Sequence, residues 1–296
     1  MATVLKTIVA TGCSSGLGFE AIKQLLTKNP PLSPPVSIST AVLGVRDTST
    51  TAAAFAADGV SPAPKLFPLE LNDLSTVKRF AAEALDTLGT MPLDYLFLNA
   101  ATAYTVDKKS KYGDWCEQYI VNHLSQHYLM HLLREKLVAS KTRIVFVSSG
   151  AIRMISDPSL LESQLKGIPG DTFVENPYPH SKFIQLLNAH YWRRTLSSTG
   201  CTVVAVSPGM VPATGLTRGA NFSMPANSPD ARSVPVGATS MLQALVRSDF
   251  PEDADRIFLT SWGEWWETEV IGKTLDTELQ VKWSPSKEQI EAEFGV

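Results

Sequence analysis

A glycine-rich loop between an apolar run and a helical pattern constrains this chain more than any other feature. Residues 4–10 form a short, largely apolar and β-branched run, which is typical of a buried parallel strand. Residues 19–28 then place apolar side chains on one helical face. Between them lie Gly12, Gly16 and Gly18. Such glycines let phosphate oxygens approach the amides at a helix N-terminus, so the loop predicts a dinucleotide site rather than a plain turn.

Strands and helices alternate along the rest of the chain. Further strands are predicted at 39–45, 65–71, 93–98, 143–147, 202–206 and 256–260. Helices are predicted at 48–58, 72–88, 114–139, 176–197 and 236–246, with a short one at 158–166. This alternation predicts an α/β fold, a Rossmann-type doubly wound parallel sheet of about seven strands with helices on both faces.

We expect a single domain over residues 1–296, because neither a repeat nor a break in composition divides the chain. Three stretches fall outside the alternation: residues 151–175, 213–235 and the C-terminal extension 261–296. They are expected to lie on the substrate side. The extension is largely polar and contains several tryptophans, among them Trp262, Trp265 and Trp266, which either line the substrate pocket or anchor the tail on the core.

Arg46 ends the second predicted strand, where the adenosine ribose of a dinucleotide lies in this architecture. An acid at that edge would hold a free 2′-hydroxyl, whereas an arginine suits a 2′-phosphate. Asp47 lies just beyond. The alternative is a solvated charge at a strand end. We expect NADPH to be favoured over NADH.

Tyr178 and Lys182 are four residues apart and can share one face of a helix. An ammonium held beside a phenol favours tyrosinate and lowers the phenol pKa, which suits a general acid near neutral pH. Asn176 is expected to cap this helix, with Pro177 as its first residue. Pro179 follows the tyrosine, so the tyrosine is expected within the first turn.

Composition excludes several classes of function. The formal net charge is −3 and no polybasic run occurs, which argues against nucleic acid and anionic membranes as partners. Cys13, Cys116 and Cys201 are widely spaced, which fits a reducing compartment and neither a disulfide framework nor a zinc site. The first residues lack a basic segment and a long apolar run, so a cytoplasmic location is expected.

The motifs together resemble the short-chain dehydrogenase/reductase family over nearly the whole chain. They occur in the family order: Thr11-Gly-x-x-x-Gly-x-Gly18, Asn99-Ala-Ala101, Asn122, Ser149, Tyr178-x-x-x-Lys182 and Pro208-Gly209. Within the family, the chain looks most like the branch that includes light-dependent protochlorophyllide reductases. That likeness rests on Asn99-Ala-Ala101, the long interval from Ser149 to Tyr178, and Pro208-Gly-x-x-x-x-Thr214-Gly-Leu216.

The resemblance implies a role for each catalytic residue. Tyr178 is the acid or base, and Lys182 lowers its pKa and binds the nicotinamide ribose. Ser149 is the hydrogen-bond donor to the substrate carbonyl; Ser148 competes for this role but does not directly precede the Gly-Ala turn. Asn122 holds the helix and the water that relay protons to Lys182.

The resemblance also implies the cofactor contacts. Glu70 replaces the usual aspartate near the adenine, beside Leu71, and Thr214 meets the nicotinamide carboxamide. The full predicted set is Gly12, Ser14, Ser15, Gly16, Leu17, Gly18, Arg46, Glu70, Leu71, Asn99, Ala100, Ala101, Tyr178, Lys182, Pro208, Gly209, Val211 and Thr214. No metal site is expected.

The implied activity is NADPH-dependent reduction of a carbonyl to an alcohol, or the reverse. The long irregular segments and the tryptophans suggest a bulky, partly apolar substrate, such as a polyketide- or terpenoid-like secondary metabolite. One alternative is reduction of a carbon–carbon double bond, as the nearest branch suggests. Another is a non-catalytic dinucleotide sensor, although such proteins usually lose the Tyr/Lys pair or the serine.

Three histidines form a stripe along the long helix predicted at 114–139. His123, His127 and His131 have the i, i+4, i+8 spacing that could hold a metal, but no acid or cysteine completes a site. A helix surface or a dimer contact is therefore the favoured interpretation. By analogy with the family, that helix lies in a dimer interface, and a homodimer or homotetramer is expected.

Overall fold

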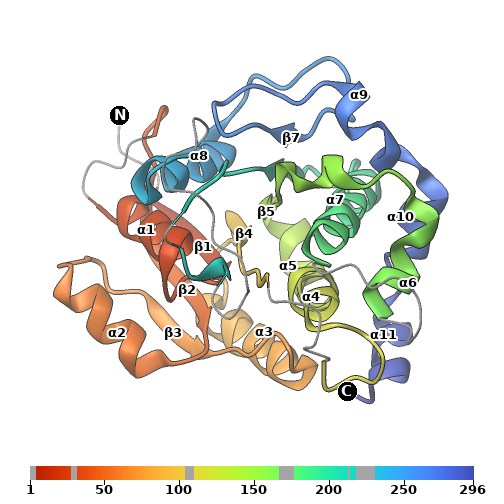
Figure 1. The fold of residues 1–296 in the computed structure, drawn as a ribbon. Coiled ribbons are helices and arrows are strands. Elements are labelled where there is room, and N and C mark those ends of the chain that lie inside the picture. The colour runs from red at the N-terminus through yellow and green to blue at the C-terminus, as the bar shows by residue number, and fades with distance from the viewer. Residues whose placement is uncertain (1–4, 28–31, 104–109, 167–176, 213, 218–230) are drawn as a thin grey trace.

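The computed structural model describes residues 5–27, 32–103, 110–166, 177–212, 214–217 and 231–296. Its centre is a sheet of seven parallel strands in the order β3-β2-β1-β4-β5-β6-β7 (Figure 1). The strands are β1 (Leu5–Thr11), β2 (Ser37–Val45), β3 (Lys65–Pro68), β4 (Tyr95–Leu98), β5 (Arg143–Val147), β6 (Thr202–Val206) and β7 (Phe258–Leu259). The predicted doubly wound fold is confirmed. The order reverses beside β1, and ligands of such sheets bind at that switch point.

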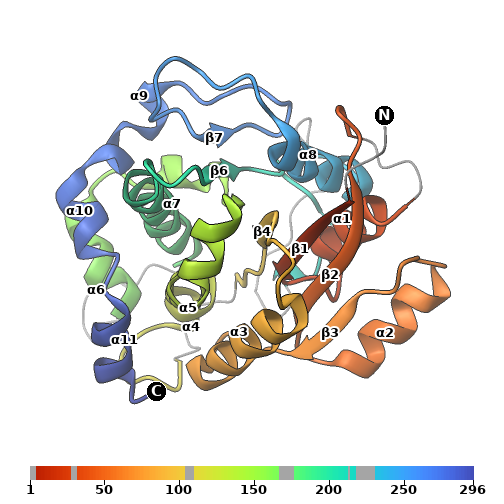
Figure 2. The same ribbon diagram turned by 180° about the vertical axis from the view of Figure 1, so that it is seen from behind.

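Helices cover both faces of the sheet (Figures 1 and 2). On one face lie α1 (Gly16–Leu25), α2 (Thr48–Ala57) and α8 (Val234–Val246), and on the other α3 (Leu74–Leu88), α5 (Ser125–Ser140) and α7 (Tyr178–Thr195). Two short helices, α4 (Glu117–Tyr119) and α6 (Leu161–Lys166), flank the second group. The observed bounds of the long helices lie within a few residues of those predicted from the sequence.

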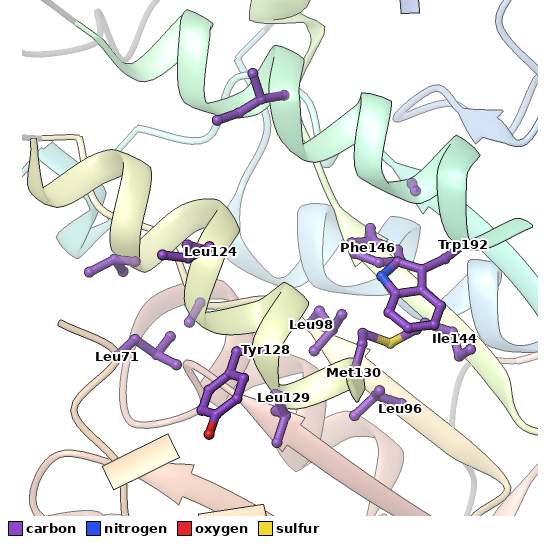
Figure 3. Packing of buried hydrophobic residues seen from close by; sticks show 14 of the residues in the cluster. Leu71, Leu96, Leu98, Leu124, Tyr128, Leu129, Met130, Ile144, Phe146 and Trp192 are labelled. Carbon is purple, nitrogen blue, oxygen red and sulfur yellow. The ribbon is translucent and has the colours of Figure 1, made fainter. Parts of the chain in front are cut away.

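Alternate strand residues fill two separate hydrophobic cores. In β5, Ile144 and Phe146 enter the core beneath α3, α5 and α7, whereas Val145 and Val147 enter the core beneath α1 and α8. All four side chains are buried. Figure 3 shows the first core, where Phe146 lies near Trp192 of α7. Because side chains alternate across a strand, an apolar run buried on both sides is what a covered parallel strand requires.

The start of α7 differs from the prediction. Asn176 lies outside the described residues, and Pro177, not Asn176, occupies the cap position. Pro177 has no amide hydrogen to satisfy, and its carbonyl accepts the first helical bond from the Ser181 amide at 3.0 Å. Tyr178 is therefore the first residue of the helix and Pro179 the second.

The C-terminal extension is helical, which the sequence reasoning missed. It contains α9 (Thr268–Ile271), α10 (Thr277–Lys282) and α11 (Lys287–Phe294). A capping box between Ser286 and Gln289 starts α11 and was the available sequence signal. In Figure 1 the extension runs beside α7 and α5, where α10 contacts α7 and α11 contacts α5.

The histidine stripe faces this extension, so the predicted surface or dimer contact is wrong. His123 and His127 are buried, and their Nε2 atoms lie 2.8 Å and 2.7 Å from the carbonyls of Trp283 and Pro285. His131 contacts the same Pro285 carbonyl at 3.1 Å. The C-terminal extension of the same chain covers this face of α5, so the face is buried within the molecule. The stripe fastens the extension to α5.

Acid should weaken this attachment. Burial lowers the pKa of His123 to about 4, from 6.5. Between these values the unfolded chain binds a proton that the folded chain does not, so stability falls as pH falls through this window. Each such histidine contributes up to about 1.4 kcal/mol per pH unit. His123→Gln can still donate to the Trp283 carbonyl but cannot titrate.

Thermal melts between pH 7.5 and 5 check this expectation. The melting temperature of the native chain should drop as pH falls, and that of His123→Gln should drop less steeply. Equal slopes for both proteins would show that the neutral His123 ring contributes nothing to the pH dependence.

Candidate active site

Most of the predicted site residues line one cleft at the carboxyl ends of the strands, whereas the predicted catalytic residues Asn122 and Ser149 are not among its lining residues. The cleft contains about 1210 Å³ of empty space, open solvent included. Most of the predicted cofactor set lines it: Gly12, Ser14, Ser15, Gly16, Leu17, Gly18, Arg46, Glu70, Leu71, Asn99, Ala100, Ala101, Tyr178, Lys182, Pro208 and Thr214. Gly209 and Val211 are not among the lining residues, and Val211 is buried behind it.

The glycine loop is a close-packed turn that has no room for a side chain at Gly12 or Gly18. Gly12 has φ +70°, and a Cβ there would lie 2.5 Å from the Cα of Ala100. At Gly18 a Cβ would lie 2.2 Å from the Gly12 carbonyl oxygen. The loop therefore holds the start of α1 against β1 and β4, with its backbone exposed toward the cleft. This cradle fits a dinucleotide pyrophosphate at a helix N-terminus.

Asn99 fastens this loop from the neighbouring strand. Its Nδ2 donates to the carbonyl of Gly12 at 2.8 Å and more weakly to that of Thr11 at 3.3 Å. The Thr11 hydroxyl in turn accepts from the Ala100 amide at 3.2 Å. The Asn99-Ala100 segment thus fixes the loop, in addition to lining the cleft.

Arg46 is exposed at the end of β2 and lines the cleft. The neighbouring acid is already engaged: the Asp47 carboxylate accepts from the Thr50 amide at 2.9 Å and caps α2. Hydrogen bonds from Thr50 and Ser49 lower the pKa of Asp47 to about 2. In the described part of the chain, no ion pair ties down Arg46, so its charge is available to the cleft.

Near the position predicted for the adenine, the carboxylate of Glu70 accepts a hydrogen bond from the Asn72 amide at 3.0 Å. Leu71 is buried beside it, and its carbonyl accepts from the Ser125 hydroxyl. Thr214 lies against the glycine loop, because a Cβ built on Gly16 would be 3.6 Å from the Cβ of Thr214. These contacts place all three residues at the cleft wall.

Tyr178 and Ser149 are hydrogen-bonded to each other. Burial raises the pKa of Tyr178 to about 12, and the bond with Ser149 acts in the opposite direction. Ser149 also caps a short 3-10 turn, where its hydroxyl accepts from the Ala151 amide at 3.2 Å. The phenol is therefore protonated at neutral pH, the form that a proton donor needs.

Lys182 does not lower the tyrosine pKa as expected. Its Nζ lies 5.8 Å from the centre of the Tyr178 ring and donates instead to the Val147 carbonyl at 2.8 Å. The side chain is 1% exposed, and burial lowers the pKa of its amine to about 7. A buried amine that is partly neutral exerts little pull on the phenol, which accounts for the difference.

Asn122 is fully buried in a π-helical turn, Ile120–Leu124, between α4 and α5. Its side chain accepts from the Thr102 amide at 2.8 Å and donates to the Thr102 carbonyl at 2.9 Å. It also donates to the Ser181 hydroxyl at 2.9 Å, and that hydroxyl donates to the Tyr178 carbonyl. A π-turn often marks a functional position. Here it lets one side chain connect the end of β4 with the first turn of α7.

Sequence reasoning missed part of the cleft lining. The additional lining residues are Gly44, Val45, Leu69, Thr102, Glu117, Val121, Val147, Ser148, Gly215 and Leu216. Most of them directly neighbour a predicted residue at a strand end, and this position was the available signal. Ser148, considered as a rival to Ser149, lines the cleft, but its hydroxyl points to the Lys182 carbonyl at 3.4 Å.

The tryptophans have separate positions. Trp265 donates to the Asp249 carbonyl at 3.0 Å and anchors the tail. Trp266 packs against the 3-10 turn Gly150–Met154, because a Cβ on Gly150 would lie 3.6 Å from the Trp266 ring. Trp262 is 60% exposed. None of the three is among the residues that line the cleft.

Comparison with known proteins gives the family. The family model for short chain dehydrogenases matches residues 6–157. A short-chain dehydrogenase/reductase of Pestalotiopsis microspora is 48% identical over 98% of this chain and 99% of its own. The chain belongs to the short-chain dehydrogenase/reductase family. It is accordingly an oxidoreductase of the family that uses nicotinamide dinucleotides.

Two further similar proteins have lower sequence identity to this chain. The human WW domain-containing oxidoreductase is 30% identical over 69% of this chain and 48% of its own length. Among solved structures, the NADPH-bound carbonyl reductase from chicken fatty liver has a TM-score of 0.65 at 20% identity, over 90% of this chain and 95% of that one. This structure supports the shared fold. Within the described residues, no helix of this chain has the length and apolarity needed to span a bilayer.

Proposed function

We propose that this protein is an NADPH-dependent ketoreductase. The observation that carries the proposal is the hydrogen-bonded pair of Tyr178 and Ser149, because Tyr178 and Lys182 line the same cleft as the glycine loop. Bound NADPH would supply the hydride that the carbonyl carbon receives. The remaining groups needed for carbonyl reduction are a proton donor and a hydrogen-bond donor to the oxygen, and these two side chains provide both.

Each residue has a defined task. Tyr178 gives its phenolic proton to the carbonyl oxygen, and its raised pKa keeps that proton in place until the oxygen gains negative charge. Ser149 hydrogen-bonds the same oxygen and orients it. Lys182 offers an N–H to the nicotinamide ribose. Asn122 holds the start of α7 through Ser181 and so keeps Tyr178 aimed.

The substrate is proposed to be bulky and partly apolar. The turn after Ser149 carries Met154, which is 72% exposed, and Leu160 beyond it is 48% exposed. Large exposed apolar side chains next to a catalytic turn suit an apolar ligand. The segments 167–176 and 218–230, parts of the predicted substrate side, lie outside the described residues.

The coenzyme preference rests on Arg46. A guanidinium can bind a 2′-phosphate with two hydrogen bonds, and the acid beside it is occupied by the α2 cap. Arg46→Ala should therefore raise the Kd for NADPH roughly 10- to 100-fold, as expected for hydrogen bonds to a charged group, and leave NADH binding unchanged. Fluorescence titration with both coenzymes measures this.

Lys65→Ala is the matched control, because Lys65 is another exposed cation, at the opposite end of a neighbouring strand. It should leave both Kd values as they are. A native chain that prefers NADH, or an Arg46→Ala chain that keeps its NADPH affinity, would refute the assignment.

The activity itself is tested by NADPH oxidation with a panel of bulky aromatic and alicyclic ketones. Consumption with at least one ketone, and an alcohol as product, is expected. NADPH binding without consumption by any ketone or enone would favour the non-catalytic sensor instead.

A further inference from the structure

The amine of Lys182 is held by a side chain that the proposed mechanism does not include. Gln185 lies one helical turn further along α7, and its Oε1 accepts a hydrogen bond from Lys182 Nζ at 3.2 Å. Gln185 is 1% exposed, so this contact is closed to solvent. The other acceptor is the Val147 carbonyl at the end of β5, at 2.8 Å.

Two acceptors define the direction of an ammonium group. An ammonium carries three N–H donors. Val147 and Gln185 occupy two of them, which leaves one for the cleft that Lys182 lines. Without Gln185 the amine could rotate about the Val147 contact, and the third N–H would lose its fixed aim.

The rest of the Gln185 amide makes no hydrogen bond to the residues that the structure describes. Its Nε2 is buried without a partner. A buried NH₂ group left unpaired is destabilising, and a leucine or methionine at this position would avoid that cost. The hydrogen bond from Lys182 Nζ to Gln185 Oε1 orients this amide, so that its oxygen and not its NH₂ group faces the amine.

We propose that Gln185 is a positioning residue for catalysis: its amide oxygen aims the ammonium of Lys182 into the cleft and stabilises its charged form. This inference rests on the function proposed above only for the role of Lys182. It adds to the proposed mechanism a residue that contacts neither the substrate nor the cofactor.

The electrostatic surroundings of Lys182 make the effect measurable. Burial is the cause of the lowered amine pKa, and no charged side chain in the described ranges offsets it. Tyr178, on the same helix, is the titratable group that faces the amine, and from β5 the facing groups are the uncharged Val147 carbonyl and Ser148. The hydrogen bond to one neutral acceptor therefore contributes a substantial part of the stabilisation of the ammonium form.

The direct test is the pKa of Lys182 in the cofactor-free protein. It is read from ¹³C NMR of chains with labelled lysine ε-carbons, with the Lys182 signal assigned by its absence in Lys182→Met. The native pKa should lie at about 7. Gln185→Met has similar size without the acceptor and should lower it. Gln185→Glu should raise it, because a carboxylate favours the ammonium.

Activity gives the second readout. Gln185→Met should reduce kcat at pH 7.5 roughly 10- to 100-fold, as expected for a lost hydrogen bond to a charged group. The alkaline limb of its pH profile should move to lower pH, and that of Gln185→Glu to higher pH. Asn188→Leu is the control for a merely structural role. Asn188 is a buried amide of α7 that bonds Ser284, so the variant should lose thermal stability without moving the Lys182 pKa.

The two readouts separate this inference from the proposed function. An unchanged Lys182 pKa in both Gln185 variants overturns the role of Gln185, whatever the activity. Shifted pKa values in a protein that reduces no ketone would uphold the positioning role and contradict the ketoreductase proposal.

Discussion

Replacing Tyr178 with phenylalanine is expected to reduce kcat roughly 10²- to 10⁴-fold, the range that removal of a general acid produces. The ring would still fill its place at the start of α7, so the loss would come from one hydroxyl. Burial keeps this phenol protonated, and Ser149 holds its oxygen. Neither feature is needed for coenzyme binding. Steady-state turnover and NADPH fluorescence titration measure the two quantities separately.

The companion variant is Ser149→Ala. It should lower kcat less than Tyr178→Phe does, because Tyr178 would still donate a proton while one hydrogen bond to the oxygen is lost. NADPH affinity should stay near the native value in both variants. Near-native turnover by Tyr178→Phe would mean that another group supplies the proton, and the proposed mechanism would fail.

Gly18→Ala is expected to abolish coenzyme binding. The new Cβ would lie 2.2 Å from the Gly12 carbonyl oxygen and 2.3 Å from Asn99 Nδ2, distances that no real Cβ tolerates. The loop must move away from Asn99, and the backbone that would meet the pyrophosphate moves with it. Forced overpacking of this kind also costs about 1–3 kcal/mol of stability.

Gly272→Ala is the matched control, because a Cβ there would meet nothing within 4 Å. It should bind NADPH as the native chain does. Titration and thermal melts of both variants test the loop. Saturable NADPH binding of native affinity by Gly18→Ala would show that the cradle does not hold the coenzyme.

Much of the cleft could be predicted because parallel strands end at the same edge of a sheet. Gly12, Arg46 and Asn99 each follow a different strand, and the strand order then brings them together. Adjacent residues such as Val45 and Val147 were missed only because the sequence does not say which side of a strand end faces the cleft.

Other features depend on contacts between distant segments and left no clear local signal. The histidines of α5 carry a regular spacing, but the sequence does not indicate that Trp283 and Pro285 fold back onto them. Likewise, the i+3 spacing of Lys182 and Gln185 is common in helices. Only the burial of both side chains beneath Val147 makes their contact significant.

The central claim is that hydride reaches a carbonyl carbon while Tyr178 protonates the oxygen. The most direct measurement uses an enone and NADPH deuterated at C4 of the nicotinamide, with NMR of the product. The proposed ketoreductase should place one deuterium on the new carbinol carbon and leave the double bond intact. Deuterium on the carbon β to a surviving carbonyl would instead identify a double-bond reductase and contradict the claim.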